Sequence, residues 1–543
     1  MMNTEIVFVA LFSVATAVAL LARRFKLPYT VALVIAGLAL GTAHAFHAPH
    51  LTKELLYSVF LPGLLFEAAF HLEFRRFWQN KMAVFGLAIP GLIAAVALTT
   101  LLLVPVVKGL DFVEHYSIGE GLVFAALIAA TDPIAVVALF KSVGAPKRVA
   151  VLIEGESLLN DGTAVVLFTL VLSFVLGKPT SFAGAAVDFV RVVGMGVLIG
   201  GAIGYAVSAV IHKVDDPMIE ITLTTIAAYG SFVAAEELHF SGVIATVTAG
   251  MLCGNHAART GMSASTRVAV AAFWEYLAFA LNSLVFLLIG FEVRLETLVS
   301  AWQPILVAYA AVTIARAVVT HAVALLLRGT RERIPLKWAT VLTWGGLRGA
   351  LSMVLVLGLP ETFPHRELVV SMTFGVVIIS ILVQGLTMAP LLRRLGLVTA
   401  SEARAEHERL RAIIKGGRAA LAETDRMERE RSFSADVVAG VREAYEARIR
   451  EAEAAAAELQ RSSESLVKED ELVAMRQALI AEKDAVLGAH RAGQIGAESY
   501  ERVVADIDAR LFELETHDEM TRAPVVDPAA VTDPRSAKER TNP

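Results

Sequence analysis

The sequence predicts an all-α polytopic membrane protein with about thirteen transmembrane helices and a helical cytoplasmic tail. Hydrophobic residues make up 56% of the 543 residues. Residues 1–400 hold 49 charged side chains and residues 401–543 hold 52, so charge is concentrated in the last part of the chain. The first part instead contains repeated apolar runs that are long enough to cross a hydrocarbon layer about 30 Å thick.

Basic residues between the apolar runs predict the orientation. We find 18 Lys and Arg residues after odd-numbered runs and five after even-numbered ones. By the positive-inside rule, the N-terminus lies outside the cell and the tail lies in the cytoplasm, as expected for a multi-pass protein of the inner (plasma) membrane. No basic segment precedes the first run, which favours a retained helix over a signal peptide. The runs cover residues 5–22, 28–46, 54–72, 82–107, 118–140, 149–176, 184–211, 217–236, 239–254, 270–291, 302–327, 337–358 and 367–392.

Composition divides the chain into three predicted domains. Residues 1–400 form the transmembrane domain, residues 401–520 a helical cytoplasmic regulatory domain, and residues 521–543 a disordered, proline-containing end. Cys253 is the only cysteine, which excludes an intrachain disulfide and a thiolate metal cluster. No GxGxxG motif follows a strand, and we expect neither a nucleotide cofactor nor a nucleic-acid partner.

Ionisable residues within the runs are the first functional signal, because each costs about 2.5–3.5 kcal/mol at the membrane centre. In the sixth run, helical spacing aligns Glu154, Ser157 and Asp161, with Glu156 and Asn160 on a neighbouring stripe. This pattern predicts one face on a polar cavity and another on a partner helix. The alternative is a cytoplasmic loop, with the helix starting only at Leu158. Further ionisable residues are Glu67, Asp132, Arg316 and Arg348.

Two runs also contain helix-breaking residues near an ionisable side chain. The fifth run contains Thr131-Asp132-Pro133, and the twelfth contains Gly345-Gly-Leu-Arg348-Gly349. Proline interrupts helical hydrogen bonding, and the freed carbonyls survive at membrane depth only inside protein or beside water. The interruptions lie seven helices apart, which implies opposite orientations. We therefore predict two broken, crossing helices within inverted repeats formed by helices 1–6 and 8–13.

The buried charges need partners, and we expect Glu156 to pair with Arg348 and leave Asp161 free. Arg316 serves either another carboxylate or a carbonyl of a broken helix. Glu67 either lines the ion site or is a protonated structural hydrogen-bonding group.

Four segments together resemble the NhaP-type sodium/hydrogen exchangers of the first monovalent cation/proton antiporter family. They are Phe60–Glu67, Ala130–Pro133, Glu154-Gly-Glu-Ser-Leu-Leu-Asn-Asp-Gly162 and Gly345–Gly349. The resemblance covers about residues 1–400. It implies a homodimer with a dimerisation part and a mobile core. It also implies an ion held by Asp161 with help from Ser157, Thr131, Asp132 and Glu67, and a structural polar core of Asn160, Glu156 and Arg348.

The resemblance implies a transport mechanism based on one carboxylate. Desolvation lets Asp161 hold a proton, and Na⁺ displaces that proton by binding the ionised carboxylate. The exchange would be electroneutral, since Asn160 cannot titrate. A K⁺/H⁺ antiporter of the same fold is the nearest alternative. A channel and an intramembrane protease using Asp132 and Asp161 are more distant ones.

Overall fold

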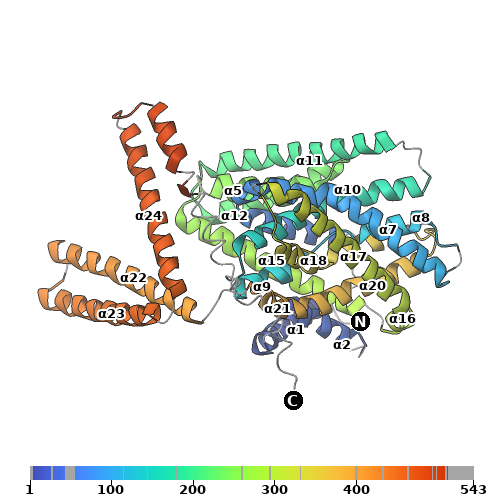
Figure 1. The fold of residues 1–543 in the computed structure, drawn as a ribbon, viewed down its shortest axis with the longest axis horizontal. Helices are drawn as coiled ribbons and strands as arrows, with labels where there is room; N and C mark the ends of the chain where they lie inside the picture. Colours follow the sequence, from blue (N-terminus) through green and yellow to red (C-terminus); the bar gives the residue numbers. More distant parts are fainter. Residues whose placement is uncertain are drawn as a thin grey trace, which may run out of the picture. The chain divides into compact units, whose positions relative to one another are not determined.

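The computed structural model in Figure 1 describes residues 4–25, 28–42, 56–113, 115–143, 145–177, 182–258, 261–292, 295–330, 332–397, 402–430, 433–461, 464–491, 493–496, 498–507 and 510–511. Within these residues the regular structure is helical, apart from one isolated bridge between extended residues. The chain divides into two compact units, residues 1–142 with 147–395, and residues 143–146 with 396–543.

The first unit confirms the predicted all-helical membrane fold. Each of the thirteen apolar runs is mainly helical where it is described, and seven helices of the described residues are long and apolar enough to span a membrane. The count of thirteen crossings remains a prediction. The elements are α1 (Thr4–Phe25), α2 (Tyr29–Thr42), η1 (Leu56–Phe60), α4 (Leu61–His71), α5 (Phe74–Gln79), α6 (Lys81–Gly86), η2 (Leu87–Gly91), α7 (Leu92–Gly109), α8 (Ile118–Leu127), α9 (Ile134–Val143), α10 (Lys147–Val175), α11 (Phe182–Ile211), α12 (Pro217–Glu237), α13 (Gly242–Leu252), η3 (Cys253–Ala257), α15 (Ala264–Glu292), α16 (Leu295–Ser300), α17 (Trp302–Leu326), η4 (Leu327–Gly329), α18 (Leu336–Trp344), α19 (Ala350–Leu357), α20 (Arg366–Ile379), η5 (Ser380–Gln384) and α21 (Gly385–Arg394).

These helices pack in two groups. The first helix group contains α1, α2, α4, α11, α12, α13 and α15, and the second contains α7, α8, α10, α17, α18 and α20. In the first group, α2 and α15 approach so closely at Gly37 and Gly290 that an added Cβ on either glycine would overlap the other helix's backbone. Helix α10 also contacts α4, α11 and α13, so it lies at the boundary between the groups.

Both predicted interruptions are present, which confirms the two broken helices. Helix α8 ends at Leu127 and α9 begins at Ile134, while α18 ends at Trp344 and α19 begins at Ala350. The two extended connections meet in an antiparallel bridge, in which the amide of Asp132 donates to the carbonyl of Leu347 at 2.8 Å. The sequence signals are Pro133, which has no amide hydrogen, and the glycines around Arg348.

In the second unit, the described residues form the charged helices α22 (Glu402–Glu430), α23 (Ala435–Arg461) and α24 (Glu464–Arg491) and a shorter helical segment at residues 498–507. Helices α22 and α23 form a hairpin, and α24 follows. Leu410, Ala452 and Ala456 form a small apolar core in the hairpin. Arg442 of α23 also pairs with two carboxylates of α22. The predicted disordered end, 521–543, lies outside the described residues.

Candidate functional site

The polar motif of the sixth run lies within one unbroken helix. Helix α10 continues from Lys147 to Val175, so the alternative with a loop before Leu158 is wrong. Glu156, Ser157 and Asn160 are buried, and Asp161 is partly buried. One turn of a membrane helix therefore presents two carboxylates, a hydroxyl and a carboxamide to its neighbours.

The two broken helices cross where α8 ends and α9 begins, and each of these helix ends has a side chain of opposite charge to its dipole. Arg348 donates through Nη1 to the carbonyls of Ala129 at 2.6 Å and Ala130 at 3.2 Å, just beyond the end of α8. Asp132 accepts from the amide of Ile134 at 3.0 Å, at the start of α9. A cation thus lies at a negative helix end and an anion at a positive one. These contacts compensate the polar groups that the interruption frees.

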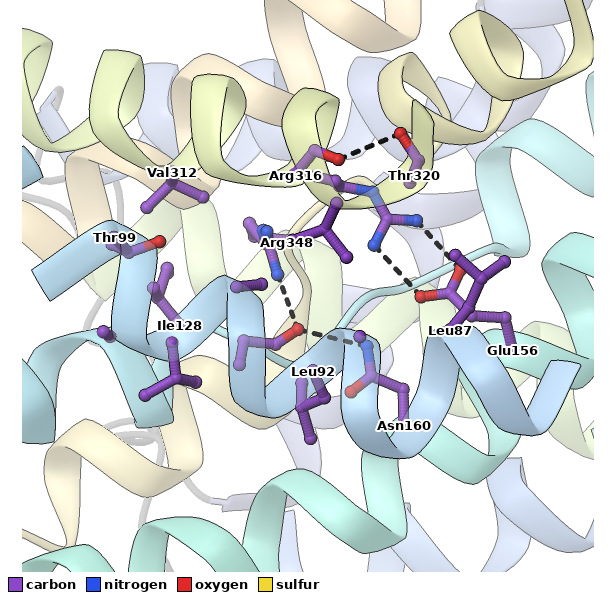
Figure 2. Close-up of a pocket in the computed structure, with 16 residues that line it drawn as sticks. Leu87, Leu92, Thr99, Ile128, Glu156, Asn160, Val312, Arg316, Thr320 and Arg348 are labelled. Atoms are coloured by element: carbon purple, nitrogen blue, oxygen red, sulfur yellow. Dashed lines mark hydrogen bonds and ion pairs between the residues drawn. The ribbon is translucent and has the colours of Figure 1, made fainter. Parts of the chain in front are cut away.

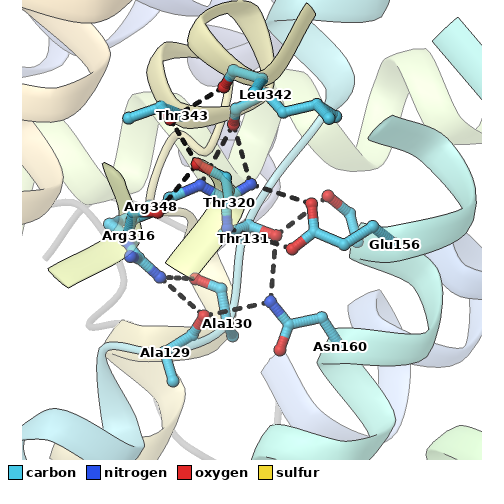
Figure 3. Close-up of polar contacts among 12 residues, drawn as sticks. Ala129, Ala130, Thr131, Glu156, Asn160, Arg316, Thr320, Leu342, Thr343 and Arg348 are labelled. Carbon is cyan, nitrogen blue, oxygen red and sulfur yellow. Dashed lines mark hydrogen bonds and ion pairs between the residues drawn. The ribbon is translucent and has the colours of Figure 1, made fainter. Parts of the chain in front are cut away.

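The predicted pair of Glu156 with Arg348 is wrong, because Glu156 pairs with Arg316 (Figure 3). Arg316 of α17 donates through Nη1 and Nη2 to the two carboxylate oxygens of Glu156, at 3.0 and 2.8 Å. It also donates to the carbonyl of Leu342 in the last turn of α18. Arg316 therefore serves both a carboxylate and a carbonyl of a broken helix. Arg348 is directed to Ala129 and Ala130 instead.

Hydroxyl and amide groups connect α10 with the first interruption. The hydroxyl oxygens of Thr131 and Ser157 lie 2.9 Å apart. Asn160 donates through Nδ2 to the carbonyl of Ala129 at 3.1 Å and to Thr131 Oγ1 at 3.2 Å. Thr131, Ser157 and Asn160 are each at most 2% exposed. This network holds the extended connection between α8 and α9 against the part of α10 that carries Asp161.

Asp161 is the acidic residue of this turn that has no fixed partner. Its carboxylate accepts no hydrogen bond and forms no ion pair with any described residue, in contrast to Glu156 and Asp132. The negative charges of Asp132 and Glu156 act on it. A carboxylate one helical turn from a hydroxyl and subject to other negative charges can hold a proton or a small hard cation. No cluster of three or more metal-binding side chains occurs among the described residues.

Comparison with known proteins now decides the family. The family model of the transmembrane sodium/hydrogen exchangers matches residues 9–394. This chain belongs to the sodium/hydrogen exchanger family. It is 40% identical over 375 residues to the Na⁺/H⁺ antiporter ApNhaP of Aphanothece halophytica, covering 69% of this chain and 70% of that protein. It is 39% identical to the Na⁺/H⁺ antiporter NhaP of Pseudomonas aeruginosa, covering 63% and 81%.

A solved structure supports the fold of this exchanger-family chain. The sodium proton antiporter MjNhaP1 of Methanocaldococcus jannaschii superposes with a TM-score of 0.60 at 17% identity, covering 72% of this chain and 99% of that one. The likeness to NhaP-type exchangers is thus confirmed in sequence and in fold. The family consists of transporters, so this chain is not classed as an enzyme.

Glu67 is the predicted site residue that the structure does not join to the others. It lies on α4, where its carboxylate contacts His71 of the same helix at 3.3 Å. His71 in turn lies 3.8 Å from Glu275 of α15. Among the described residues, no hydrogen bond connects Glu67 with Thr131, Ser157 or Asp161. Helix α4, which carries Glu67, contacts α10, which carries Asp161.

A small cavity lies beside Glu156 and Asn160 of α10 (Figure 2). Its volume is about 30 Å³, and its polar lining consists of Thr99, Glu156, Asn160, Arg316, Thr320 and Arg348. Asp161 does not line it. A cavity of this size accommodates one or two water molecules and no organic substrate. It belongs to the structural polar core and is not the candidate site for the transported ion.

Gly349 is required at the crossing because it lies against Asp132. A Cβ added there would lie 2.5 Å from Cβ and 2.6 Å from Oδ2 of Asp132. We expect Gly349→Ala to displace Asp132, to destabilise the protein by about 1–3 kcal/mol and to slow exchange. Thermal unfolding in detergent and transport in vesicles measure these effects. The matched control is Gly329→Ala, where an added Cβ meets nothing within 4 Å. Equal behaviour of the two variants would contradict the packing argument.

Proposed function

We propose that this protein is a secondary active antiporter that exchanges Na⁺ for H⁺ by competition at Asp161. The observation that carries the proposal is the carboxylate of Asp161, which has no partner among the described residues. It lies one helical turn from Ser157, whose hydroxyl contacts that of Thr131 next to the two broken helices. Asp132 and Glu67 are the further proposed ligands. No cofactor is needed, since the transported ions are the only ligands of the mechanism.

Coupling in this mechanism follows from a shared site. Asp161 holds a proton when the site is dry, because removal of water favours the neutral carboxyl. Na⁺ binds the ionised form, with protein oxygens replacing its hydration shell. The second helix group then moves against the first and exposes the site to one side at a time. The position of α10 at the boundary between the groups supports this assignment.

Selectivity is the first property to test. The named relatives are Na⁺/H⁺ antiporters, which favours Na⁺ over the alternative cargo K⁺. We expect Na⁺ to dissipate an imposed pH gradient across vesicles containing the protein, and K⁺ at equal concentration to have a much smaller effect. A response to K⁺ alone would replace the sodium assignment. Gradient dissipation without either cation would indicate a proton channel.

We expect exchange to be electroneutral, one Na⁺ for one H⁺. Glu156 is paired with Arg316, and Asp132 accepts from an amide at the start of α9, and both contacts favour an ionised carboxylate. Asn160 cannot titrate, so the proposal assigns the exchanged proton to Asp161, and Glu67 and Asp132 are the groups whose titration would add a second proton. A membrane potential applied with equal Na⁺ and equal pH on both sides should therefore drive no proton flux. A steady Na⁺-dependent flux would show that a second group titrates.

We propose that residues 401–520 regulate transport without forming the ion path. The described tail helices are charged, and none of them is among the apolar spans. A chain ending near residue 400 should still exchange in vesicles, with a shifted pH profile. A folded truncated protein that is inactive at every pH would contradict this division.

We also propose a homodimer in the plasma membrane lipid bilayer, with its N-terminus outside and its tail in the cytoplasm.

A further inference from the structure

The short helix α5 and the start of α6 expose aromatic and basic side chains where the chain enters the membrane. Helix α4 ends at His71, and the membrane span that begins with α6 starts at Lys81. Helix α5 therefore lies between two membrane helices. In the sequence, residues 73–81 are one of the basic connections between apolar runs. The structure shows that its residues form two distinct faces.

The outward face of this segment is apolar along one stripe. Phe74 is 44% exposed and Trp78 is 50% exposed, and their rings stack at 5.6 Å. Met82 and Phe85, three residues apart on α6, are exposed as well. Aromatic rings exposed beside the end of a membrane span are typical of the interface between lipid and water.

Basic groups flank this stripe. Lys81 places its Nζ 4.6 Å from the centre of the Trp78 ring. Arg75 is exposed and has no ion pair with any described residue, whereas Arg76 pairs with Glu73 at 3.0 Å. Two cations beside an amphipathic aromatic surface are complementary to a phosphate headgroup whose acyl chains lie against the rings.

The inward face joins α5 to both helix groups. At the start of α5, the amide of Phe74 donates to Asn255 Oδ1 of η3 at 2.9 Å. At its end, Arg148 of α10 donates through Nε to Asn80 Oδ1 at 2.6 Å. Phe77 is buried against Gly155, where an added Cβ would lie 3.1 Å from the ring. Gly155 precedes Glu156, so α5 packs directly on the helix that carries Asp161.

We propose that Phe74, Arg75, Trp78 and Lys81 form a binding site for an anionic phospholipid of the bilayer, and that the bound lipid stimulates exchange. The lipid would hold α5 at the membrane surface while α10 moves relative to η3. This regulation rests on the proposed antiport function, but lipid binding can be measured without it.

Binding is tested by quenching of Trp78 fluorescence in vesicles of phosphatidylcholine containing brominated phosphatidylglycerol or brominated phosphatidylcholine. The difference between the full-length protein and its Trp78→Phe variant isolates the Trp78 signal. We expect stronger quenching by the brominated anionic lipid. Each basic residue near an anionic surface contributes about fivefold to binding, so Arg75→Gln with Lys81→Gln should reduce the preference about 25-fold. Equal quenching by both lipids, or none, overturns the site.

The matched control removes one arginine and one lysine elsewhere. Lys213 and Arg328 are exposed at the ends of other helices, and Lys213→Gln with Arg328→Gln should keep the preference of Trp78 for the anionic lipid.

Sodium-driven exchange is then measured with and without phosphatidylglycerol. We expect stimulation in the parent protein and in the control variant, and its loss in the Arg75 and Lys81 variant. Equal stimulation in all three overturns the regulatory role. Absence of exchange in every lipid, with selective quenching intact, contradicts the antiport proposal instead.

Discussion

Asp161→Asn is expected to fold normally and to exchange no measurable Na⁺ for H⁺. The amide has nearly the shape of the carboxyl, but it neither releases a proton nor offers a negative charge to a cation. Since Asp161 has no fixed partner among the described residues, its replacement breaks no observed ion pair, and the melting temperature should change little. Vesicles with an imposed pH gradient measure the loss directly.

The control for this variant is Asp188→Asn, which makes the same chemical change on α11, away from the crossing. It should retain exchange close to that of the parent protein. Appreciable sodium-driven proton movement by Asp161→Asn would rule out competition at this carboxylate. Loss of exchange in both variants would show that the assay reports general damage.

Glu156→Gln is expected to cost about 3–5 kcal/mol of stability, far more than Asp161→Asn, because it leaves Arg316, whose side chain is only 11% exposed, without its anion. A double-mutant cycle identifies the partner. Glu156→Gln combined with Arg316→Gln should destabilise much less than the sum of the single changes. The same cycle with Arg348→Gln should show a smaller coupling, since Arg348 donates to backbone carbonyls.

The comparison for this cycle is an exposed ion pair. Glu73 and Arg76 lie 3.0 Å apart with both side chains about a third to a half exposed, and removing either should cost no more than about 1 kcal/mol. Thermal unfolding in one detergent at one pH serves all variants. A larger coupling of Glu156 with Arg348 than with Arg316 would contradict the observed pairing.

The helix interruptions could be predicted from sequence because their causes are local. Pro133 lacks an amide hydrogen, and three glycines surround Arg348, so each run shows its own weak point. The partner of Glu156 could not be predicted in the same way. Two arginines of the membrane helices, Arg316 and Arg348, were available, and the choice depends on which lies near the end of α8. That information is tertiary, since the bond from Arg348 to Ala129 joins residues 219 positions apart.

The surroundings of Glu67 and of α5 also depend on tertiary packing and could not be predicted from the sequence. Helical spacing places Glu67 on a membrane helix, but its distance from Asp161 depends on how α4 packs against α10. The basic residues of α5 were evident as an orientation signal. That they belong to the exposed face of a short helix becomes evident only from the structure, in which Phe77 forms the buried face.

The bridge between Asp132 and Leu347 has a consequence for biogenesis. The carbonyls of Ala129 and Ala130 receive their cation from Arg348, which is synthesised more than two hundred residues later. Until that segment enters the membrane, the interruption after α8 has polar groups that lipid cannot satisfy. The first six apolar runs therefore lack this cation during their own translation. The crossing next to the proposed site at Asp161 is completed only when the twelfth apolar run, which carries Arg348, enters the membrane.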